Sequence, residues 1–295
     1  MSARVISGKE IAAEIRAELK ADVEALRARG VTPGLGVILV GDDAASISYV
    51  TAKETACEEI GIRSDDNRLP GDVTQAGLHD MIQRLNADPG IHGILLQLPL
   101  PAHLDESAAL LEIDPAKDVD GLHPVSAGNL VTGRDTYFPC TPHGVLQMLT
   151  RSGVQIEGAT VAIVGRSNLV GRPLASLLTR KAADGNATVT VCHSRSRDIA
   201  AHTRDADIVI AAAGRPGLIT ADMIKPGAVV IDVGVNRVED SSRKSGFRLV
   251  GDVDFEGVKE KASMITPVPG GVGPMTITML LYNTVQSALR AAEGE

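Results

Sequence analysis

Aromatic side chains are scarce in this sequence of 295 residues, which contains no Trp, three Tyr and three Phe. Proteins that hold single-stranded nucleic acids stack the bases on aromatic rings, so this class of partner is disfavoured. Basic charge is not in excess either, because 29 Lys and Arg stand against 37 Asp and Glu and the formal net charge is −8. A surface that follows a phosphate backbone needs a dense basic stripe. The composition argues against a nucleic-acid partner but is compatible with a local phosphate site.

Long apolar runs are also missing. No stretch approaches the roughly 20 apolar residues that cross a bilayer. The N-terminal "MSARVISGKEIAAEIRAEL" has no apolar core of the signal-peptide kind. We therefore expect a cytoplasmic protein with no membrane partner.

Cysteine is rare and widely spaced. Cys57, Cys140 and Cys192 are odd in number and form no C-x-x-C motif, so they suit neither a disulfide framework nor a metal knuckle. The seven histidines contain no H-x-x-x-H pair. We expect reduced thiols and no catalytic metal.

Helix-type and strand-type patterns alternate along the chain, which is typical of α/β proteins with a parallel sheet covered by helices. A stretch of low periodicity, residues 114–142, separates two such halves. We predict an N-terminal α/β catalytic domain over residues 1–140, completed by a C-terminal helix over residues 275–295. Residues 141–274 are predicted to form a Rossmann-like domain, with a cleft between the two domains. Apolar strands of this second domain are expected in "TVAIVG", "TVTVCHS", "DIVIAAAG" and "AVVIDVG".

The segment "VAIVGRSNLVGRP" has the form of a dinucleotide-binding turn. An apolar strand runs into Gly165, and Gly171 opens the next helix, but Ser167 and Asn168 stand where G-x-G-x-x-G requires further glycines. A glycine turn followed by a helix N-terminus offers free N–H groups to a pyrophosphate. The same pattern is also found in tight strand-to-helix connections without a ligand.

The next predicted strand lacks the acidic residue that bonds the ribose of NAD, since it ends in His193, Ser194 and Arg195. A hydroxyl group and the guanidinium of Arg166 suit the 2′-phosphate of NADP instead. The pattern favours NADP over NAD. The alternative is that these arginines form an ordinary solvated face.

Tyr49 and Lys53 are spaced i, i+4 and share one face of a predicted helix. Gln97 follows the apolar strand "GILL", where loops converge. Y-x-x-x-K also occurs in short-chain dehydrogenases, but there the glycine turn precedes the Tyr and Lys, whereas here the order is reversed. That assignment is rejected, and an ordinary surface pair remains the alternative.

Nine motifs together resemble one family, that of bifunctional methylenetetrahydrofolate dehydrogenase/methenyltetrahydrofolate cyclohydrolase. The resemblance covers nearly the whole chain, in the family's order and approximate spacing. The motifs are "SYVTAKETACEEIGI", "GILLQLPLP", "PAKDVDGLHP", "PCTPHGV", "GRSNLVGRP", "ADIVIAAAGRPGLI", "IKPGAVVIDVGVNR", "LVGDVDF" and "TPVPGGVGPMTITML".

The resemblance implies roles for residues of the first domain. Lys53 is the catalytic amine of the cyclohydrolase step, Gln97 holds it, and Tyr49 stacks on the aminobenzoyl ring of the folate. Asp120 grips the amino-pyrimidine edge of the pterin, a task that suits a carboxylate because it accepts two N–H groups at once. An Asx turn that orders the loop is the alternative for Asp120. Leu98 and Pro99 also belong to the implied substrate site.

In the second domain the family's NADP contacts correspond to Gly165, Arg166, Ser167, Ser194 and Val235. The loop with Pro269, Gly270 and Gly271 is implied to lie where folate meets nicotinamide, since glycines permit close backbone approach. A purely structural turn is the alternative there.

The implied activity is oxidation of 5,10-methylenetetrahydrofolate with NADP⁺, followed by hydrolysis of the methenyl product to 10-formyltetrahydrofolate, in one-carbon metabolism. The family also implies a homodimer. A monofunctional cyclohydrolase would not need the glycine turn, and a non-catalytic NADP-binding regulator would not need Tyr49, Lys53, Gln97 and Asp120. Both alternatives fit only part of the chain.

Overall fold

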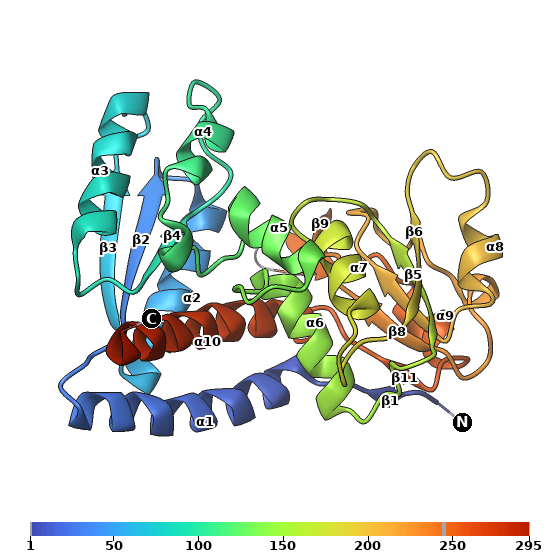
Figure 1. Cartoon of the computed structure of the whole chain (residues 1–295). Helices are drawn as coiled ribbons and strands as arrows, with labels where there is room; N and C mark the ends of the chain where they lie inside the picture. The colour runs from blue at the N-terminus through green and yellow to red at the C-terminus, as the bar shows by residue number, and fades with distance from the viewer. Residues whose placement is uncertain (1, 244–245, 295) are drawn as a thin grey trace. The chain divides into compact units, whose positions relative to one another are not determined.

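The computed structural model describes residues 2–243 and 246–294, and the chain divides into two compact units. Unit 1 comprises Met1–Ala12 and Thr141–Thr276, and unit 2 comprises Ala13–Cys140 and Ile277–Glu295. Each unit has its own parallel sheet with helices beside it (Figure 1). The predicted α/β class is confirmed.

Unit 2 contains a three-stranded parallel sheet in the order β3-β2-β4. The central strand β2 is buried along its whole length, as its unbroken apolar sequence predicts. Leu78, Ile82 and Leu85 on one face of α3 pack with residues of β2 and β4 in a shared core. The elements are β2 (Gly34–Val40), α2 (Ala44–Ile60), β3 (Arg63–Leu69), α3 (Gln75–Ala87), β4 (Gly93–Leu96), α4 (Glu106–Leu111) and α5 (Pro124–Thr132).

Unit 1 contains a six-stranded parallel sheet in the order β1-β11-β8-β7-β5-β6. The first strand of its nucleotide-type half, β5, lies between β6 and β7, so the strand order changes direction at β5. In doubly wound folds ligands bind beyond the carboxyl ends of the strands at such a point. The elements are β1 (Arg4–Val5), β5 (Thr160–Val164), α7 (Gly171–Thr179), β6 (Thr188–Cys192), α8 (Ile199–Thr203), β7 (Ile208–Ala211), β8 (Val229–Asp232), α9 (Phe255–Lys259) and β11 (Met264–Ile265).

A two-stranded antiparallel hairpin, β9 (Asn236–Glu239) and β10 (Phe247–Val250), follows β8 in the same unit. Lys244 and Ser245 in its loop lie outside the described residues. Val250 pairs with Asn236, so the chain leaves the hairpin close to where it entered. The hairpin thereby returns the chain from β8 to the segment that contains Asp252.

Three helices include a boundary between the units: α1 (Gly8–Ala28), α6 (Cys140–Arg151) and α10 (Val272–Glu293). The sequence placed residues 1–12 with the first domain, whereas the structure groups them with unit 1. The physical reason is β1, which pairs with β11 and aligns Arg4 with Met264. Within the described residues, no helix combines the length and apolar character that a bilayer crossing requires.

Candidate functional site

The predicted lysine lies on α2 and is buried. Asp43 caps this helix by accepting the N–H of Ser46 at 2.8 Å, and Gly61 ends it with a φ of 89°. Tyr49 and Lys53 lie one turn apart, and the Lys53 Nζ is 4.6 Å from the centroid of the Tyr49 ring. The helix therefore aligns the ammonium group with an aromatic face, as the i, i+4 spacing predicts.

Gln97 follows β4 and meets this lysine. Its backbone N–H donates to the Ile38 carbonyl of β2 at 2.9 Å, and its Nε2 donates to the Leu98 carbonyl at 2.7 Å. The side-chain amide is thus held with Oε1 accepting a 3.0 Å hydrogen bond from Lys53 Nζ. The Leu98–Pro99 peptide bond that follows is cis. The structure brings Tyr49, Lys53 and Gln97 together.

Burial governs the charge of the lysine. Lys53 is only 4% exposed, and this burial lowers the pKa of its amine below the ordinary value. The negative charge of Asp120 acts in the opposite direction on that pKa. Asp120 is therefore close enough to act on the amine, and the structure places all four predicted catalytic side chains in one region of unit 2.

The loop before Asp120 is fixed by a different carboxylate. Asp118 is 2% exposed and accepts the N–H of His123 at 2.8 Å and the hydroxyl of Ser126 at 2.6 Å. The next carbonyl, that of Val119, accepts a 2.8 Å hydrogen bond from Asn283 on α10. Asp118 thus orders the loop, which leaves Asp120 as the half-buried carboxylate beside the lysine.

Cys140 is a neighbour of the lysine that sequence reasoning treated only as a reduced thiol. Its Sγ donates to the Val119 carbonyl at 3.4 Å, and burial raises the pKa of the thiol well above its usual range. A thiol with a raised pKa stays largely neutral, which makes it a poor nucleophile and a poor metal ligand. Its place before "TPHGV" gives no signal of this contact, because the partner is 21 residues away in the chain.

In unit 1, Gly165 and Gly171 close the turn between β5 and α7. Gly165 has a φ of 137°, and a Cβ there would lie 2.1 Å from the Ala212 carbonyl oxygen. A Cβ on Gly171 would lie 2.1 Å from the Gly165 oxygen. At both positions the backbone contact is too close for any side chain, so only glycine fits. Ser167, by contrast, is exposed.

The start of α7 is open to a ligand. The first turn of α7 has no side-chain cap, although the Ser167 hydroxyl accepts the Val170 N–H at 3.1 Å. Within this turn Arg172 donates its N–H to the Ser167 carbonyl at 3.1 Å and Pro173 has no N–H, so the Gly171 N–H and the positive end of the helix dipole are the features that suit a phosphate. Among the residues present, this turn therefore fits the pyrophosphate of a dinucleotide.

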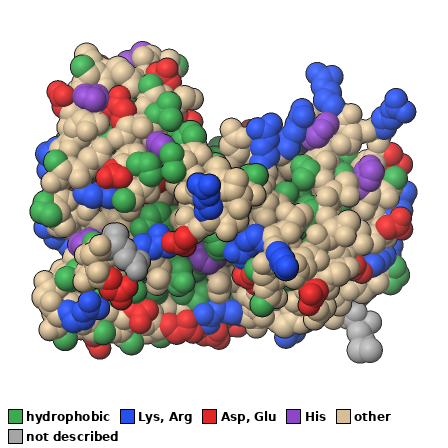
Figure 2. All heavy atoms as spheres, viewed as in Figure 1, with side chains coloured by type: hydrophobic (Ala, Val, Ile, Leu, Met, Phe, Trp, Pro, Cys, Tyr) green, Lys and Arg blue, Asp and Glu red, His purple; other side chains and the backbone are tan. Residues whose placement is uncertain are grey.

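The register of β5 and β6 places two predicted cofactor residues at one edge. Val164 pairs with Cys192, and Arg166 and Ser194 each follow two residues later. Both are exposed, as is Arg195. Figure 2 shows basic side chains protruding from unit 1 above the loop that joins β6 to α8. A hydroxyl and guanidinium groups are thus available for a second phosphate.

The remaining predicted residues of unit 1 follow β8 and β11. Val235 comes three residues after β8 and is 60% exposed. Gly270 has a φ of 98°, and a Cβ on Gly271 would lie 2.4 Å from the Pro267 oxygen. The Val268–Pro269 peptide bond is cis. Both segments lie at the carboxyl edge of the sheet that also carries Gly165.

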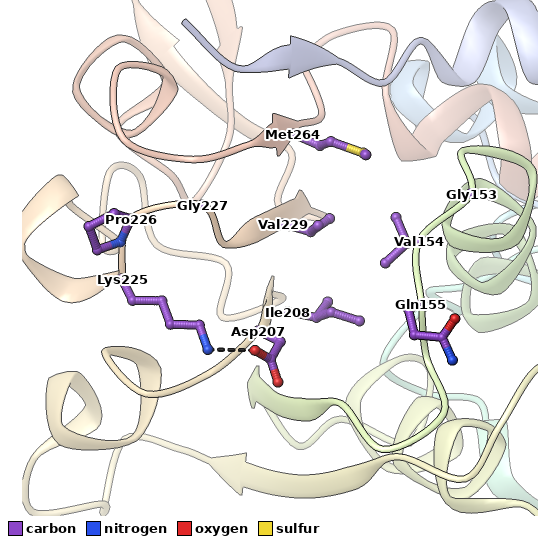
Figure 3. Close-up of a pocket in the computed structure, with 10 residues that line it drawn as sticks. All are labelled: Gly153, Val154, Gln155, Asp207, Ile208, Lys225, Pro226, Gly227, Val229 and Met264. Atoms are coloured by element: carbon purple, nitrogen blue, oxygen red, sulfur yellow. Dashed lines mark hydrogen bonds and ion pairs between the residues drawn. The ribbon is translucent and has the colours of Figure 1, made fainter. Parts of the chain in front are cut away.

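Two cavities lie at the opposite edges of the sheets, near the amino ends of the strands. One, of about 420 Å³, is lined by residues at the amino ends of β7, β8 and β11 (Figure 3). The other, of about 670 Å³, includes Ile91 and His92 before β4. Neither contains a predicted site residue. In the described part of the chain, no group of three His, Cys, Asp or Glu side chains is placed to hold a metal ion.

The chain matches the sequence models of two protein-family domains. Residues 6–120 match the catalytic domain of tetrahydrofolate dehydrogenase/cyclohydrolase, and residues 139–292 match the NAD(P)-binding domain of the same family. The chain belongs to the tetrahydrofolate dehydrogenase/cyclohydrolase family. The predicted family is confirmed, and the protein is a bifunctional dehydrogenase and cyclohydrolase of folate one-carbon metabolism. The match to both domains favours this activity over a monofunctional cyclohydrolase and over a non-catalytic NADP-binding regulator.

Relatives match over nearly the full length. The bifunctional protein FolD of Syntrophus aciditrophicus is 57% identical, and the match covers 99% of each chain. Among solved structures, FolD of Campylobacter jejuni is 47% identical with a TM-score of 0.93, covering 98% of this chain and 100% of that one. FolD of Trypanosoma brucei, complexed with NADP cofactor and an inhibitor, is 45% identical with a TM-score of 0.93 and 99% coverage of both.

Proposed function

We propose that Lys53 carries the cyclohydrolase step of this enzyme and that the Gly165 turn holds NADP for the dehydrogenase step. The observation on which the proposal depends is the buried Lys53 amine, which Gln97 holds at 3.0 Å and whose pKa burial lowers. The substrate is 5,10-methylenetetrahydrofolate, and the successive products are the methenyl cation and 10-formyltetrahydrofolate.

The dehydrogenase step requires alignment more than acid or base chemistry. The carbon that loses a hydride is already activated by two nitrogens, so positioning is the chief contribution of the protein. Bound NADP⁺ supplies the hydride acceptor. In unit 1, the uncapped start of α7 is proposed to bind the pyrophosphate, with Gly165 and Ser167 beside it and Val235 on the next loop.

The cyclohydrolase step requires proton transfer. Water adds to the methenyl carbon and loses one proton, which gives a neutral hydroxyl adduct. The hydroxyl of this adduct then loses its proton and the ring nitrogen gains one as the carbon–nitrogen bond opens, so one proton is released overall. An amine with a lowered pKa is neutral in a larger fraction of molecules, so Lys53 can take the proton from water. The cationic substrate lowers the pKa of this amine further by like-charge repulsion. Gln97 keeps the amine in place because its own amide is fixed by the Leu98 carbonyl.

Folate recognition is assigned to the same region of unit 2. We assign Asp120 to the amino-pyrimidine edge of the pterin and the Tyr49 ring to the aminobenzoyl group, with Leu98 and Pro99 beside them. The loop of Pro269, Gly270 and Gly271 is assigned to the junction of folate and nicotinamide. The positive φ of Gly270 supports a backbone that approaches its ligand closely.

NADP is preferred over NAD because of Arg166 and Ser194. Their strands pair in register, and the β6 loop supplies a hydroxyl where NAD-specific folds carry an acid. The Trypanosoma brucei relative, complexed with NADP, supports the same choice. We also propose that the enzyme is cytoplasmic and a homodimer. Sedimentation of the purified protein tests its dimeric state.

The decisive experiment follows NADPH and the methenyl intermediate together in purified protein supplied with methylenetetrahydrofolate and NADP⁺. NADPH should accumulate while the methenyl absorbance stays low, since hydrolysis follows oxidation. Hydrolysis of added methenyltetrahydrofolate without NADPH formation would identify a monofunctional cyclohydrolase. Binding of NADP with neither turnover would identify a regulator.

A further inference from the structure

Two carboxylates are buried side by side in unit 1: Asp232 ends β8, and Asp252 follows β10 and contacts the loop after β7. Asp252 is fully buried and Asp232 is 3% exposed. Buried carboxylates are costly unless hydrogen bonds satisfy them. The hydrogen-bond donors around the two carboxylates therefore indicate which segments the carboxylates hold in place.

Asp252 is surrounded by backbone donors of one loop. Its Oδ2 accepts the N–H groups of Ala213 at 2.6 Å and Gly214 at 2.8 Å, and its Oδ1 accepts that of Arg215 at 2.8 Å. The Asn236 Nδ2 adds a fourth hydrogen bond, at 2.9 Å. Three successive N–H groups form an anion-binding nest, here filled by a side chain of the protein itself.

Asp232 ends β8 and holds the loop that follows. Its Oδ1 accepts the N–H groups of Gly234 at 3.0 Å and of Asp252 at 2.9 Å. Its Oδ2 accepts the N–H of Val253 at 2.9 Å. One carboxylate thus fixes the turn that leads to Val235 and also the backbone of the other carboxylate.

Two glycines make this arrangement possible. A Cβ on Gly234 would lie 2.2 Å from Asp252 Oδ1, and a Cβ on Gly251 would lie 1.8 Å from Asp232 Oδ2. Each carboxylate therefore packs directly on a glycine of the other segment. The segments "DVGVN" and "VGDVD" thus each supply one carboxylate and the glycine on which the other carboxylate packs.

The held loop also forms one wall of the glycine turn. Ala212, which precedes the nest, presents its carbonyl oxygen to Gly165, where a Cβ would be 2.1 Å away. Its N–H donates to Val164, the last residue of β5, at 2.8 Å. A shift of residues 213–215 would therefore be passed to the Gly165 turn through Ala212.

We propose that Asp252 and Asp232 are positioning residues of the cofactor site: Asp252 holds residues 213–215 against the Gly165 turn, and Asp232 holds the loop that carries Val235. The inference rests on the proposed NADP site. Because Asp252 already occupies the nest, residues 213–215 shape the cofactor site without binding its phosphates. The phosphates are left to the start of α7 and to Arg166.

The first test is Asp252→Asn, which replaces one acceptor oxygen by an NH₂ group that faces backbone donors. The KM and the dissociation constant for NADP should rise by about tenfold or more. Hydrolysis of supplied methenyltetrahydrofolate, measured without cofactor, should stay within about twofold of wild type.

Asp207→Asn is the matched control at the opposite edge of the same sheet. Asp207 accepts the Thr160 N–H at 2.8 Å and a hydrogen bond from Lys225 Nζ at 2.5 Å (Figure 3). It precedes β7, whereas the nest follows β7. This control also removes a satisfied carboxylate of unit 1, yet NADP affinity should not change. Equal effects of both variants on the KM for NADP would overturn the inference.

Hydrogen exchange in the wild-type protein provides a test that needs no variant. Peptides covering residues 213–215 should be protected before any cofactor is added, because Asp252 already binds their N–H groups. Protection that appears only with NADP would contradict the proposal. If Arg166→Ala weakens NADP while Asp252→Asn behaves as the control, only this inference fails. If wild type does not bind NADP, the proposed cofactor site itself fails.

Discussion

The Lys53 region of unit 2 is built around a buried side chain, whereas the Gly165 turn of unit 1 is built around close backbone contacts. Lys53 is 4% exposed, and burial lowers the pKa of the amine that we propose as the base. The Gly165 turn depends on close backbone contact, and its side chains Arg166 and Ser167 are exposed. Proton transfer needs a desolvated group, whereas binding a phosphate needs accessible donors. Substitutions in the two regions should therefore affect different measurements.

The largest expected effect belongs to Lys53→Met. Methionine keeps an unbranched stem of similar reach but removes the amine. Positioned acid or base groups contribute about 10²–10⁴-fold, so cyclohydrolase turnover should fall by at least about 100-fold while hydride transfer survives in part. The variant should release methenyltetrahydrofolate that decays no faster than in buffer.

Lys53→Arg is the companion variant, because a guanidinium stays protonated and cannot act as a base. It should also fail at hydrolysis. Wild-type hydrolysis in Lys53→Met, or equal loss of both activities with folate still bound, would remove the assigned role.

Arg166→Ala should act on the other region. The proposed charged partner of the 2′-phosphate is lost, at roughly 1.5–3 kcal/mol for a charged hydrogen bond, or about 10–150-fold in NADP affinity. Affinity for NAD should change far less. Titration of the purified variant with both cofactors measures the difference, and an equal loss for NAD and NADP would refute the assignment.

Asp120→Asn should lower both activities together by weakening folate binding. The substitution keeps the size but replaces one acceptor oxygen with a donor, at about 1–3 kcal/mol, or roughly 5–150-fold in folate affinity. The matched control is Asp114→Asn. Asp114 lies in the same loop region but caps residues 115–117 through the Ala116 N–H at 2.9 Å. Loss of only one activity in Asp120→Asn would indicate a role in that step alone.

The smallest effect concerns the pH profile of hydrolysis. Burial lowers the pKa of Lys53, so the neutral, active amine should appear as pH rises, with a midpoint below the ordinary 10.5. Asp120 raises this pKa, so Asp120→Asn should move the midpoint to lower pH, at saturating folate. Asp114→Asn should leave the midpoint where it is. A midpoint that moves upward in Asp120→Asn would show that Lys53 is not the titrating base.

Apolar strands were predictable because burial on both faces demands unbroken apolar sequence, as in β2, β5, β7 and β8. The sequence of β3, "RSDDNRL", lacks the apolar run that predicts a strand. The reason is that β3 lies at the edge of its sheet, next to β2, and stays partly exposed. Helix α5 lies inside the stretch assigned to a domain boundary. Its local signals, His123 as the cap, Pro124 at the first turn and Gly133 at the end, act over only nine residues.

The candidate site was predictable where spacing or resemblance carried the information. Tyr49 and Lys53 share a helix face, and Gln97 follows a recognisable strand. The roles of Asp232 and Asp252 were not predictable from the residues alone. Each follows an apolar segment as an ordinary loop carboxylate would, and Asp252 finds its three backbone donors 37 to 39 positions earlier.

The helix α10 has a consequence for synthesis on the ribosome. Asn283 donates to the carbonyls of Val119 and Phe138, and Ser287 donates to that of His92. Unit 2 therefore cannot complete its interior until Asn283 and Ser287 have left the exit tunnel. At about 5–20 residues per second, residues 13–140 wait for roughly 8–30 seconds without these hydrogen bonds from α10. A gene fragment that stops after Cys140 should accordingly yield a chain that recruits chaperones or aggregates, while the separately supplied peptide 272–295 should rescue its solubility.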